Sequence, residues 1–191
     1  MTLRALALIG IIAMTVVASA APADHDIHDT IESIGLVLIF ICIAGRTWCS
    51  FYIGSRKLHE LVTTGPYSVS RNPLYVFSTI GAIGVGATFG SIACAAIAGG
   101  VVFGVFLRLA RSEESALVEF HGEAFRHYCE RVPRFWPRLS AWRDGETLTI
   151  SQSAVYSTFF DSLFFIAAFP LAEGIEWLQQ TGLLRPLLLL P

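Results

Sequence analysis

The sequence predicts an all-α fold, a multi-pass transmembrane bundle of about five helices that forms a single domain over residues 1–191. Apolar residues make up 54% of the chain and charged residues only 15%, and the mean hydropathy is +0.61. Soluble domains of this size carry more charge. The apolar runs are continuous rather than alternating, so helices are the expected way to satisfy backbone polar groups in lipid. The net charge of −2 gives no reason to expect a nucleic-acid partner.

The first apolar segment, residues 5–18, has two interpretations. Arg4 precedes it and Ala18-Ser19-Ala20 follows, so residues 1–20 are either a retained first helix or a signal peptide cut after Ala20. Its 14 residues are few for a membrane span. In either case we expect the acidic stretch 24–32, with His25 and His28, to be a solvated loop on the non-cytoplasmic side.

A second helix is expected over residues 33–53, and a helical hairpin follows further along the chain. The apolar runs 74–90 and 91–107 contain 17 residues each and meet at Phe89-Gly90-Ser91. At ~1.5 Å per residue each run reaches roughly 25 Å, which suits a tight membrane hairpin. Pairs of glycines four residues apart, Gly86–Gly90 and Gly100–Gly104, indicate close contact between helices.

A fifth helix is expected over residues 155–172, and residues 187–190 are expected to lie at the membrane interface because they are too few to span it. In this topology the basic residues gather on one side, which the positive-inside rule makes cytoplasmic. They are Arg56, Lys57, Arg71, Arg108, Arg111, Arg126, Arg131, Arg134, Arg138 and Arg143.

Two polar motifs border the hairpin and are expected to meet at its cytoplasmic end. The first is Gly65-Pro66-Tyr67-Ser68-Val69-Ser70-Arg71-Asn72-Pro73-Leu74-Tyr75, and the second is Arg111-Ser112-Glu113-Glu114. Pro73 suits the first turn of a helix, with Asn72 as its N-cap. Helical spacing places Glu114 toward a pocket and Glu113 more to the side. Structural interpretations remain open: a helix entry with interfacial tyrosines, and an acidic pair that offsets Arg111.

Downstream, Gly122 is expected to end the helix that carries the acidic pair, and residues 123–131 to form a second short helix. The following segment, Val132-Pro133-Arg134-Phe135-Trp136-Pro137, is expected to be extended. Its Phe135 and Trp136 are available to stack or to lie at the membrane interface.

Two ionisable residues lie in apolar surroundings, Arg46 in the second helix and Asp161 in the fifth. They are interpreted either as an ion pair or, for Arg46, as a side chain that extends to the interface. The four cysteines, Cys42, Cys49, Cys94 and Cys129, form no CxxC pair and are interpreted as packing residues. No metal site is expected, because His121 and His127 fit no zinc spacing.

At its motifs the chain resembles the membrane-embedded methyltransferases that include isoprenylcysteine carboxyl methyltransferases and phospholipid N-methyltransferases. The matching pieces are Gly65-Pro66-Tyr67, Arg71-Asn72-Pro73-Leu74-Tyr75, Arg111-Ser112-Glu113-Glu114 and Val132-Pro133-Arg134-Phe135-Trp136-Pro137. The aromatic helix departs slightly from the family pattern, with an inserted His121 and with Phe125 in place of a tyrosine. The resemblance covers about residues 35–137, and residues 65–137 would form the catalytic core.

The resemblance implies S-adenosyl-L-methionine as methyl donor, a pocket on the cytoplasmic face, and a membrane lipid or lipid-modified acceptor. It implies that the cofactor-binding residues are Tyr67, Asn72, Pro73, Leu74, Tyr75, Glu113, Glu114, Tyr128 and Phe135. Arg71 and Arg134 are the expected catalytic residues, holding an anionic acceptor or the cofactor carboxylate. The acceptor could be an isoprenylcysteine-like carboxyl group or a phospholipid amine, and a non-catalytic membrane scaffold remains an alternative.

One family feature fits poorly. The glycine motif of the phospholipid methyltransferases matches Gly84-Val85-Gly86, which lies about ten residues, or roughly 15 Å, along the helix from Leu74. At that depth we expect these glycines to serve helix packing rather than cofactor binding.

Overall fold

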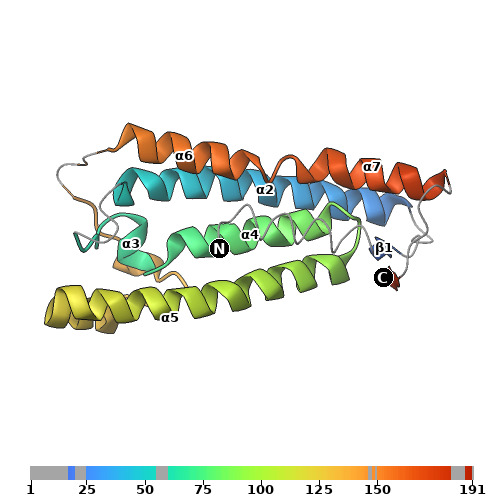
Figure 1. The fold of residues 1–191 in the computed structure, drawn as a ribbon. Coiled ribbons are helices and arrows are strands. Elements are labelled where there is room, and N and C mark those ends of the chain that lie inside the picture. Colours follow the sequence, from blue (N-terminus) through green and yellow to red (C-terminus); the bar gives the residue numbers. More distant parts are fainter. Residues whose placement is uncertain are drawn as a thin grey trace.

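The computed structural model describes residues 17–19, 25–54, 60–145, 148, 150–181 and 188–190. In these residues the fold is helical apart from one pair of three-residue strands, which confirms the predicted class. Figure 1 shows the long helices side by side as an elongated bundle. Helix α2 packs against α4 and α6, and α4 packs against α5.

Helix α2, His25–Ile53, begins eight residues before the expected start, so the prediction of a solvated loop over the acidic stretch was wrong from His25 onward. Asp26 lies in the first turn, where a carboxylate is favoured by the positive end of the helix dipole. His28 packs against the turn at Gly90, since a Cβ built on that glycine would lie 1.9 Å from the His28 Nδ1 atom. The early start of α2 therefore rests on tertiary contact as well as on its own sequence.

The predicted hairpin is formed by α4, Pro73–Ala87, and α5, Ile92–Arg131. The turn between them contains Gly90 with φ 64°, a left-handed conformation that favours glycine. Ser91 caps α5, and its hydroxyl accepts a hydrogen bond of 3.2 Å from the Cys94 amide. The hairpin and its turn are thus confirmed, although α4 ends three residues earlier than expected.

Small residues bring α4 close to both neighbours. A Cβ on Gly84 would lie 2.7 Å from the Gly35 carbonyl oxygen of α2, and one on Gly86 would lie 2.5 Å from the Ala95 Cα of α5. These contacts confirm the packing role of both glycines. By contrast, a Cβ on Gly100 or Gly104 would meet none of the described atoms within 4 Å, so close helix contact at that pair stays a prediction.

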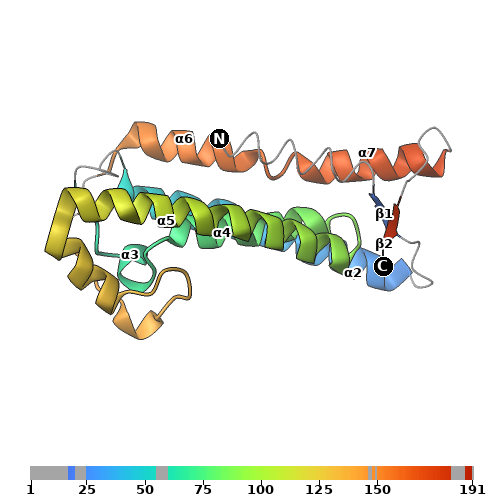
Figure 2. The same ribbon diagram turned by 60° about the horizontal axis from the view of Figure 1, so that its bottom comes forward.

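Helix α5 changes direction at Gly122, where the backbone has φ 53° and ψ −126°. The residues that follow are helical again up to Arg131, as expected. In Figure 2 this last part of α5 turns back beside the end of the bundle. The reversal returns its aromatic side chains toward the start of α4.

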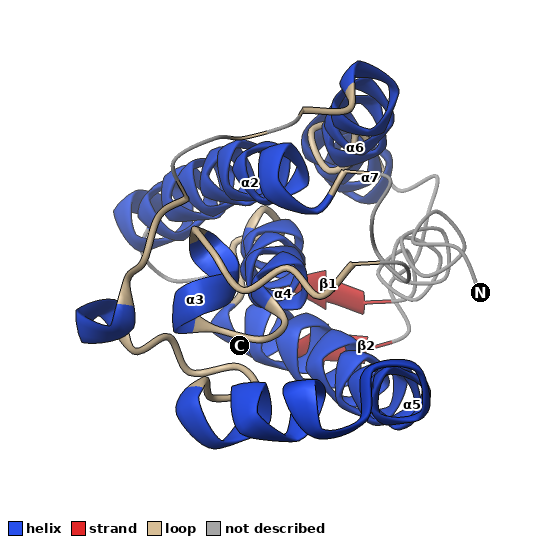
Figure 3. Cartoon of the chain, turned by 90° about the vertical axis from the view of Figure 1, so that its left-hand side faces the viewer, coloured by secondary structure: helices blue, strands red, loops and turns tan. Residues whose placement is uncertain are grey.

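The expected fifth helix is two helices, α6 (Gln152–Leu163) and α7 (Ala168–Gln180), with a turn over residues 164–167. Pro170 accounts for the break, because in a continuous helix its ring would clash with the carbonyl of residue 166. In the first turn of α7 the same proline is tolerated. Figure 3, seen from the end of the bundle, places α6 and α7 beside α2. The start of α5 also meets α7, because Cys94 shares a core cluster with Ala172 and Ile175.

The two short strands, β1 (Val17–Ser19) and β2 (Leu188–Leu190), pair in parallel. Val17 and Ala18 were expected to end a helix or signal peptide, and the structure instead places them in this strand. The rest of that segment, residues 1–16, lies outside the described residues, as do Arg56 and Lys57.

Three segments are long and apolar enough to cross a membrane: Asp26–Ile53, Ile92–Arg131 and Gln152–Ile175. Helix α4 is apolar but shorter, with 15 residues. The helices thus have the composition of an integral membrane protein.

Arg46 joins three helices inside the bundle. Its Nε donates to the Ser162 hydroxyl of α6 at 2.8 Å, and its Nη1 donates to the Ser78 hydroxyl of α4. Asp161, next to Ser162, attracts the guanidinium electrostatically. Arg46 therefore faces inward, whereas a direct Arg46–Asp161 ion pair stays a prediction.

Candidate functional site

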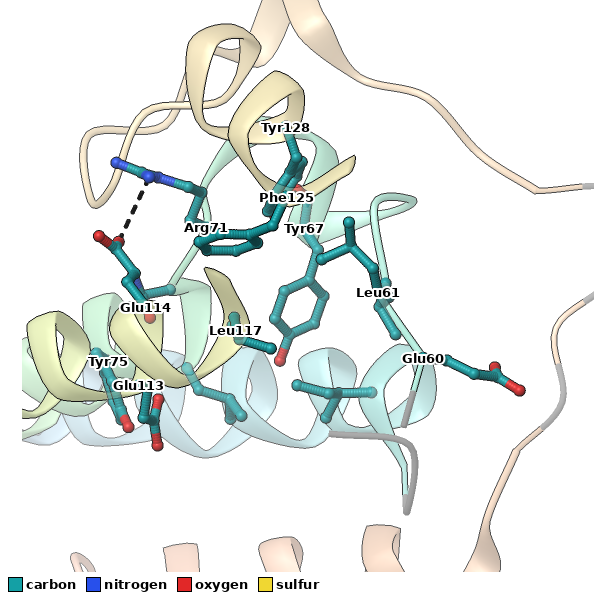
Figure 4. Close-up of a pocket in the computed structure, with 14 residues that line it drawn as sticks. Glu60, Leu61, Tyr67, Arg71, Tyr75, Glu113, Glu114, Leu117, Phe125 and Tyr128 are labelled. Atoms are coloured by element: carbon teal, nitrogen blue, oxygen red, sulfur yellow. Dashed lines mark hydrogen bonds and ion pairs between the residues drawn. The ribbon is translucent and has the colours of Figure 1, made fainter. Parts of the chain in front are cut away.

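A cavity of about 270 Å³ lies where the start of α4 meets the middle and end of α5 (Figure 4). It brings together the two polar motifs that the sequence separates by the length of the hairpin. The lining residues are Ile53, Glu60, Leu61, Val62, Tyr67, Arg71, Asn72, Leu74, Tyr75, Glu113, Glu114, Leu117, Phe125 and Tyr128.

The short helix α3, Pro66–Val69, places Tyr67 at this cavity, and all four of its residues are buried. It follows Gly65, whose φ is 59°, and a Cβ there would lie 2.2 Å from the Tyr52 ring. Only glycine suits both the backbone angle and the close approach. The Gly65 amide also donates to the Arg143 carbonyl at 2.8 Å, which ties α3 to a distant part of the chain.

Residues 132–143, called the bracing loop here, hold the first motif along its backbone. The amides of Arg71 and Asn72 donate to the carbonyls of Pro133 and Arg134 at 2.9 and 3.2 Å. In the opposite direction, the Arg138 amide donates to the Val69 carbonyl at 2.9 Å. These bonds fix the position from which α4 begins.

Asn72 occupies the predicted N-cap position of α4, and Pro73 the first turn. The Asn72 side chain makes no capping bond, however. Its Nδ2 donates to the Arg134 carbonyl at 3.2 Å, so the amide group fastens the bracing loop instead.

Glu114 is held by two arginines at the edge of the cavity. Nη2 of Arg134 lies 2.7 Å from one of its carboxylate oxygens, and Nε of Arg134 donates to both oxygens at 3.0 and 3.1 Å. Arg71 adds an ion pair of 3.6 Å. The hydrogen bonds to Glu114 raise the pKa of Arg134, so its guanidinium remains a charged donor.

The three tyrosines of the cavity differ in the partners of their hydroxyl groups. Tyr128 donates to the Tyr67 carbonyl at 2.7 Å, and Tyr75 hydrogen-bonds with Glu113. Tyr67 is only 5% exposed, so water reaches little of it. Its buried hydroxyl has no hydrogen-bond partner among the described residues. In Figure 4 it points into the cavity near Leu117.

A buried polar group without a partner is costly, and such groups in native proteins call for an explanation. Burial raises the pKa of Tyr67 well above its usual value, so the phenol remains a neutral donor. The Nε of Arg71 is a second buried donor without a partner. The cavity therefore offers unused donors to a bound molecule.

Among the described residues that line the cavity, three are acidic, Glu60, Glu113 and Glu114, and one is basic, Arg71. Apolar and aromatic side chains cover the remaining wall, among them Leu117 and Phe125. Such a lining suits a ligand with a cationic centre and an apolar or aromatic part. Within the described residues, no group of three or more His, Cys, Asp or Glu is arranged to hold a metal ion.

Eight of the eleven predicted site residues line the cavity: Tyr67, Arg71, Asn72, Leu74, Tyr75, Glu113, Glu114 and Tyr128. The prediction that Glu113 points more to the side was wrong, because α5 presents both glutamates to the cavity. Pro73, Arg134 and Phe135 are not part of the lining. Arg134 acts on Glu114 from outside it, and Phe135 contacts the Phe103 ring at 5.2 Å between centroids.

The lining residues that the sequence argument did not assign to the site are Ile53, Glu60, Leu61, Val62, Leu117 and Phe125. Leu117 had a signal, since it follows Glu113 and Glu114 at helical spacing. Phe125 was noted as a departure from the aromatic pattern of the family. The segment 60–62 had no signal, because its place depends on how the chain returns from α2 to α3.

Comparisons with known proteins identify a family and individual relatives of this chain. The phospholipid methyltransferase family matches residues 32–124. The cobalt-zinc-cadmium resistance protein CzcN of Cupriavidus metallidurans is 34% identical over 153 residues, which cover 80% of this chain and 70% of that protein. The nickel-cobalt-cadmium resistance protein NccN of Alcaligenes xylosoxydans xylosoxydans is 34% identical over 168 residues, 88% of this chain and 78% of the relative.

A more limited match is the protein-S-isoprenylcysteine O-methyltransferase of Schizosaccharomyces pombe, 32% identical over 97 residues, 50% of this chain and 41% of that enzyme. No solved structure matches. The chain belongs to the superfamily of integral-membrane methyltransferases that includes the phospholipid and isoprenylcysteine enzymes. This bears out the resemblance inferred from the motifs.

Proposed function

We propose that this protein is an S-adenosyl-L-methionine-dependent methyltransferase that acts on a lipidic or lipid-linked acceptor at the cytoplasmic face of the membrane. The observation that carries the proposal is the cavity itself. It joins the two motifs of the family beside a buried tyrosine hydroxyl that has no partner.

The cavity fits the chemistry of this cofactor. The sulfonium and ammonium groups are cationic, and Glu113 and Glu114 supply carboxylates for them. The adenine needs an apolar slot, for which Phe125 and Tyr128 provide aromatic faces. The unpartnered hydroxyl of Tyr67 supplies a neutral donor for a ring nitrogen or a hydroxyl of the cofactor.

When bound, the cofactor would supply an electrophilic methyl group: a bond from the acceptor to the methyl carbon would form as the carbon–sulfur bond breaks, and the thioether S-adenosylhomocysteine would leave with the electron pair. The protein's residues then act by binding, alignment and exclusion of water. Arg71 and Arg134 hold Glu114 in one orientation, so its carboxylate does not reorganise when a cation arrives. Arg71 also keeps its unpartnered Nε for an anionic oxygen of the acceptor or the cofactor.

Two acceptor classes remain candidates, a carboxyl group on a lipid-modified cysteine and an amine of a phospholipid. The match to the phospholipid methyltransferase family and the acidic residues of the cavity lining favour the amine. The unpartnered Arg71 Nε favours the carboxylate. Incubation of membranes with radiolabelled methyl donor, followed by separation of lipids from lipid-linked protein, distinguishes the two classes by the labelled product.

Substitution of Glu114 tests the cofactor assignment. Glu114→Gln should weaken binding of S-adenosyl-L-methionine by about 1–3 kcal/mol, because a neutral amide replaces the charged acceptor. Titration calorimetry on the purified protein measures the change. Glu123→Gln is the matched control, since Glu123 pairs with Arg126 on the exposed end of α5. Equal affinities of the wild type and Glu114→Gln would contradict the assignment.

The same measurements separate an enzyme from a non-catalytic scaffold of the same fold. A scaffold would show no cofactor affinity in either the wild type or the Glu123→Gln control. A protein that binds the cofactor but labels no lipid or lipid-linked product would retain the binding site without turnover.

A further inference from the structure

The bracing loop exposes large apolar side chains on its surface. Trp136 is 83% exposed and Leu139 is 77% exposed. Arg138, between them, and Arg143 are also exposed, and the described residues include no carboxylate paired with either. Exposed apolar groups interleaved with unpaired cations are unusual for a surface in water alone.

Contacts with two membrane helices fix the position of this loop along the direction perpendicular to the membrane. Trp142 stacks on Trp48 of α2, with ring centroids 5.5 Å apart and planes at 14°. Phe135 packs edge-on against Phe103, in the apolar half of α5. Trp48 lies five residues before the end of α2 at Ile53, so the loop lies where the apolar helices end. Tryptophan and arginine concentrate at that level of a bilayer.

The loop is also bonded to the first motif, whose residues line the cavity. Four backbone amides, those of Gly65, Arg71, Asn72 and Arg138, make hydrogen bonds between the first motif and residues 133–143. Arg134 adds the bonds to Glu114. Any partner that orders the outer side chains of the loop therefore also orders the first motif.

We propose that the bracing loop binds the headgroup region of the bilayer through Trp136, Arg138 and Leu139, and that anionic lipid there stabilises the cavity. The partner is a lipid surface rather than a protein because the apolar side chains lie level with the ends of the membrane helices. The arginines add attraction to anionic headgroups. The proposal concerns docking and order, so it stands whether or not the proposed methyl transfer is correct.

Fluorescence quenching by brominated lipid tests the docking. The full-length protein is placed in nanodiscs of phosphatidylcholine with phosphatidylglycerol, brominated either near the headgroup or near the chain ends. We expect the Trp136→Phe variant to lose the share of the shallow-bromine quenching that Trp136 contributes, while Trp48 and Trp142 keep theirs. Trp177→Phe, which removes an exposed tryptophan of α7, is the control. The signal of Trp136 is the difference between the wild type and Trp136→Phe. If water-soluble iodide quenches that signal and shallow bromine does not, the proposal is overturned.

Amide hydrogen exchange tests the link between the lipid and the cavity. Adding phosphatidylglycerol to phosphatidylcholine nanodiscs should slow exchange in residues 65–72 by up to about fivefold, the effect of one arginine near an anionic surface. Arg138→Gln should remove this slowing, whereas Arg126→Gln should keep it because Arg126 lies on the last part of α5 and pairs with Glu123.

Three exchange results would overturn the link. They are no change with phosphatidylglycerol, an unchanged effect in Arg138→Gln, and equal slowing in α2 and residues 65–72. Because the assay uses no methyl donor, its failure is distinct from failure to bind the cofactor.

Discussion

At the scale of single residues, Tyr67, Tyr75 and Tyr128 present three outcomes for the same side chain in one cavity. The Tyr128 hydroxyl donates a hydrogen bond to the Tyr67 carbonyl and thereby holds α3 in place. Tyr75 hydrogen-bonds with Glu113, and its ring stacks on Phe106 with centroids 4.5 Å apart. Tyr67 alone of the three has a hydroxyl with no partner. Two of the three hydroxyls are thus engaged within the protein, and the hydroxyl of Tyr67 is the one proposed to bind a ligand.

This difference predicts opposite effects for two conservative substitutions. Tyr67→Phe should leave the thermal midpoint unchanged or raise it, because it removes a buried donor that has no partner. It should weaken S-adenosylhomocysteine binding by about 0.5–1.5 kcal/mol if that hydroxyl donates to the ligand. Tyr128→Phe should lower the midpoint, because it leaves the buried Tyr67 carbonyl unbonded. Thermal unfolding and titration calorimetry measure both effects.

A drop in the stability of Tyr67→Phe with unchanged ligand affinity would show that its hydroxyl serves the fold. Such a result would remove Tyr67 from the ligand-binding set and leave Glu113 and Glu114 as the basis of the proposed site.

The sequence identified most polar residues of the site because their motifs are local and specific. What it could not give is which partner each polar group takes. Asn72 holds the predicted N-cap position but bonds to the bracing loop, and Arg134 bonds to Glu114 from outside the cavity. Both partners are distant along the chain, so their positions depend on the packing of the whole fold.

At the scale of elements, the reversal at Gly122 returns Phe125 and Tyr128 to the cavity. Its φ of 53° with ψ of −126° belongs to a region that residues with a Cβ rarely occupy. Nothing described lies within 4 Å of a Cβ at this position, so the backbone angle alone requires glycine.

Gly122→Ala should therefore destabilise the last part of α5 by about 1–3 kcal/mol, and should weaken ligand binding through loss of Phe125 and Tyr128 from the wall. Gly100→Ala is the matched control. Gly100 is exposed in the helical part of α5, with no described atom within 4 Å of a Cβ, and alanine there should be neutral or stabilising by about 0.5–1 kcal/mol. Thermal unfolding compares the two. Equal midpoints would contradict the role of the angle.

Element boundaries were predictable where one residue decides them. Gly90, Gly122 and Pro73 mark the hairpin turn, the reversal and the start of α4, and all three were expected. The start of α2 was missed because His28 packs on a turn that lies far away in sequence. The break between α6 and α7 was missed although Pro170 signals it, because the surrounding apolar run was interpreted as one span.

At the scale of the whole molecule, Arg46 is the polar connection between α2, α4 and α6. Both of its serine partners are fully buried and also donate to backbone carbonyls of their own helices, Ser78 to Leu74 and Ser162 to Thr158. The serines therefore keep a partner if the arginine is removed, whereas the arginine loses one if a serine is removed.

This asymmetry predicts that Ser162→Ala lowers stability by about 1–3 kcal/mol, because a buried guanidinium loses an acceptor. Arg46→Met should cost less or be neutral, as replacement of a buried charge by an apolar side chain often is. Thermal unfolding in one detergent measures both variants. A larger loss for Arg46→Met than for Ser162→Ala would indicate that the charge itself, with Asp161, holds the bundle together.

The class of fold followed from composition and from the lengths of the apolar runs, since lipid allows few alternatives. The arrangement of helices did not follow. Gly86 and Gly90 both make close contacts, while a Cβ on Gly100 or Gly104 would meet no described atom, although the two pairs have the same spacing in sequence. Which small-residue face is used depends on which neighbour reaches it.

Helix α4 has 15 residues and its partner α2 has 29, which correspond to about 22 and 43 Å of helix. A hydrocarbon layer is about 30 Å thick, so helix α4 is too short to cross it unless the bilayer becomes thinner around the protein. The cavity lies at the start of α4, beside one end of this short helix. A lipid reactant would then reach the protein by sideways diffusion, and reaction rate would follow membrane thickness and two-dimensional density rather than concentration in water.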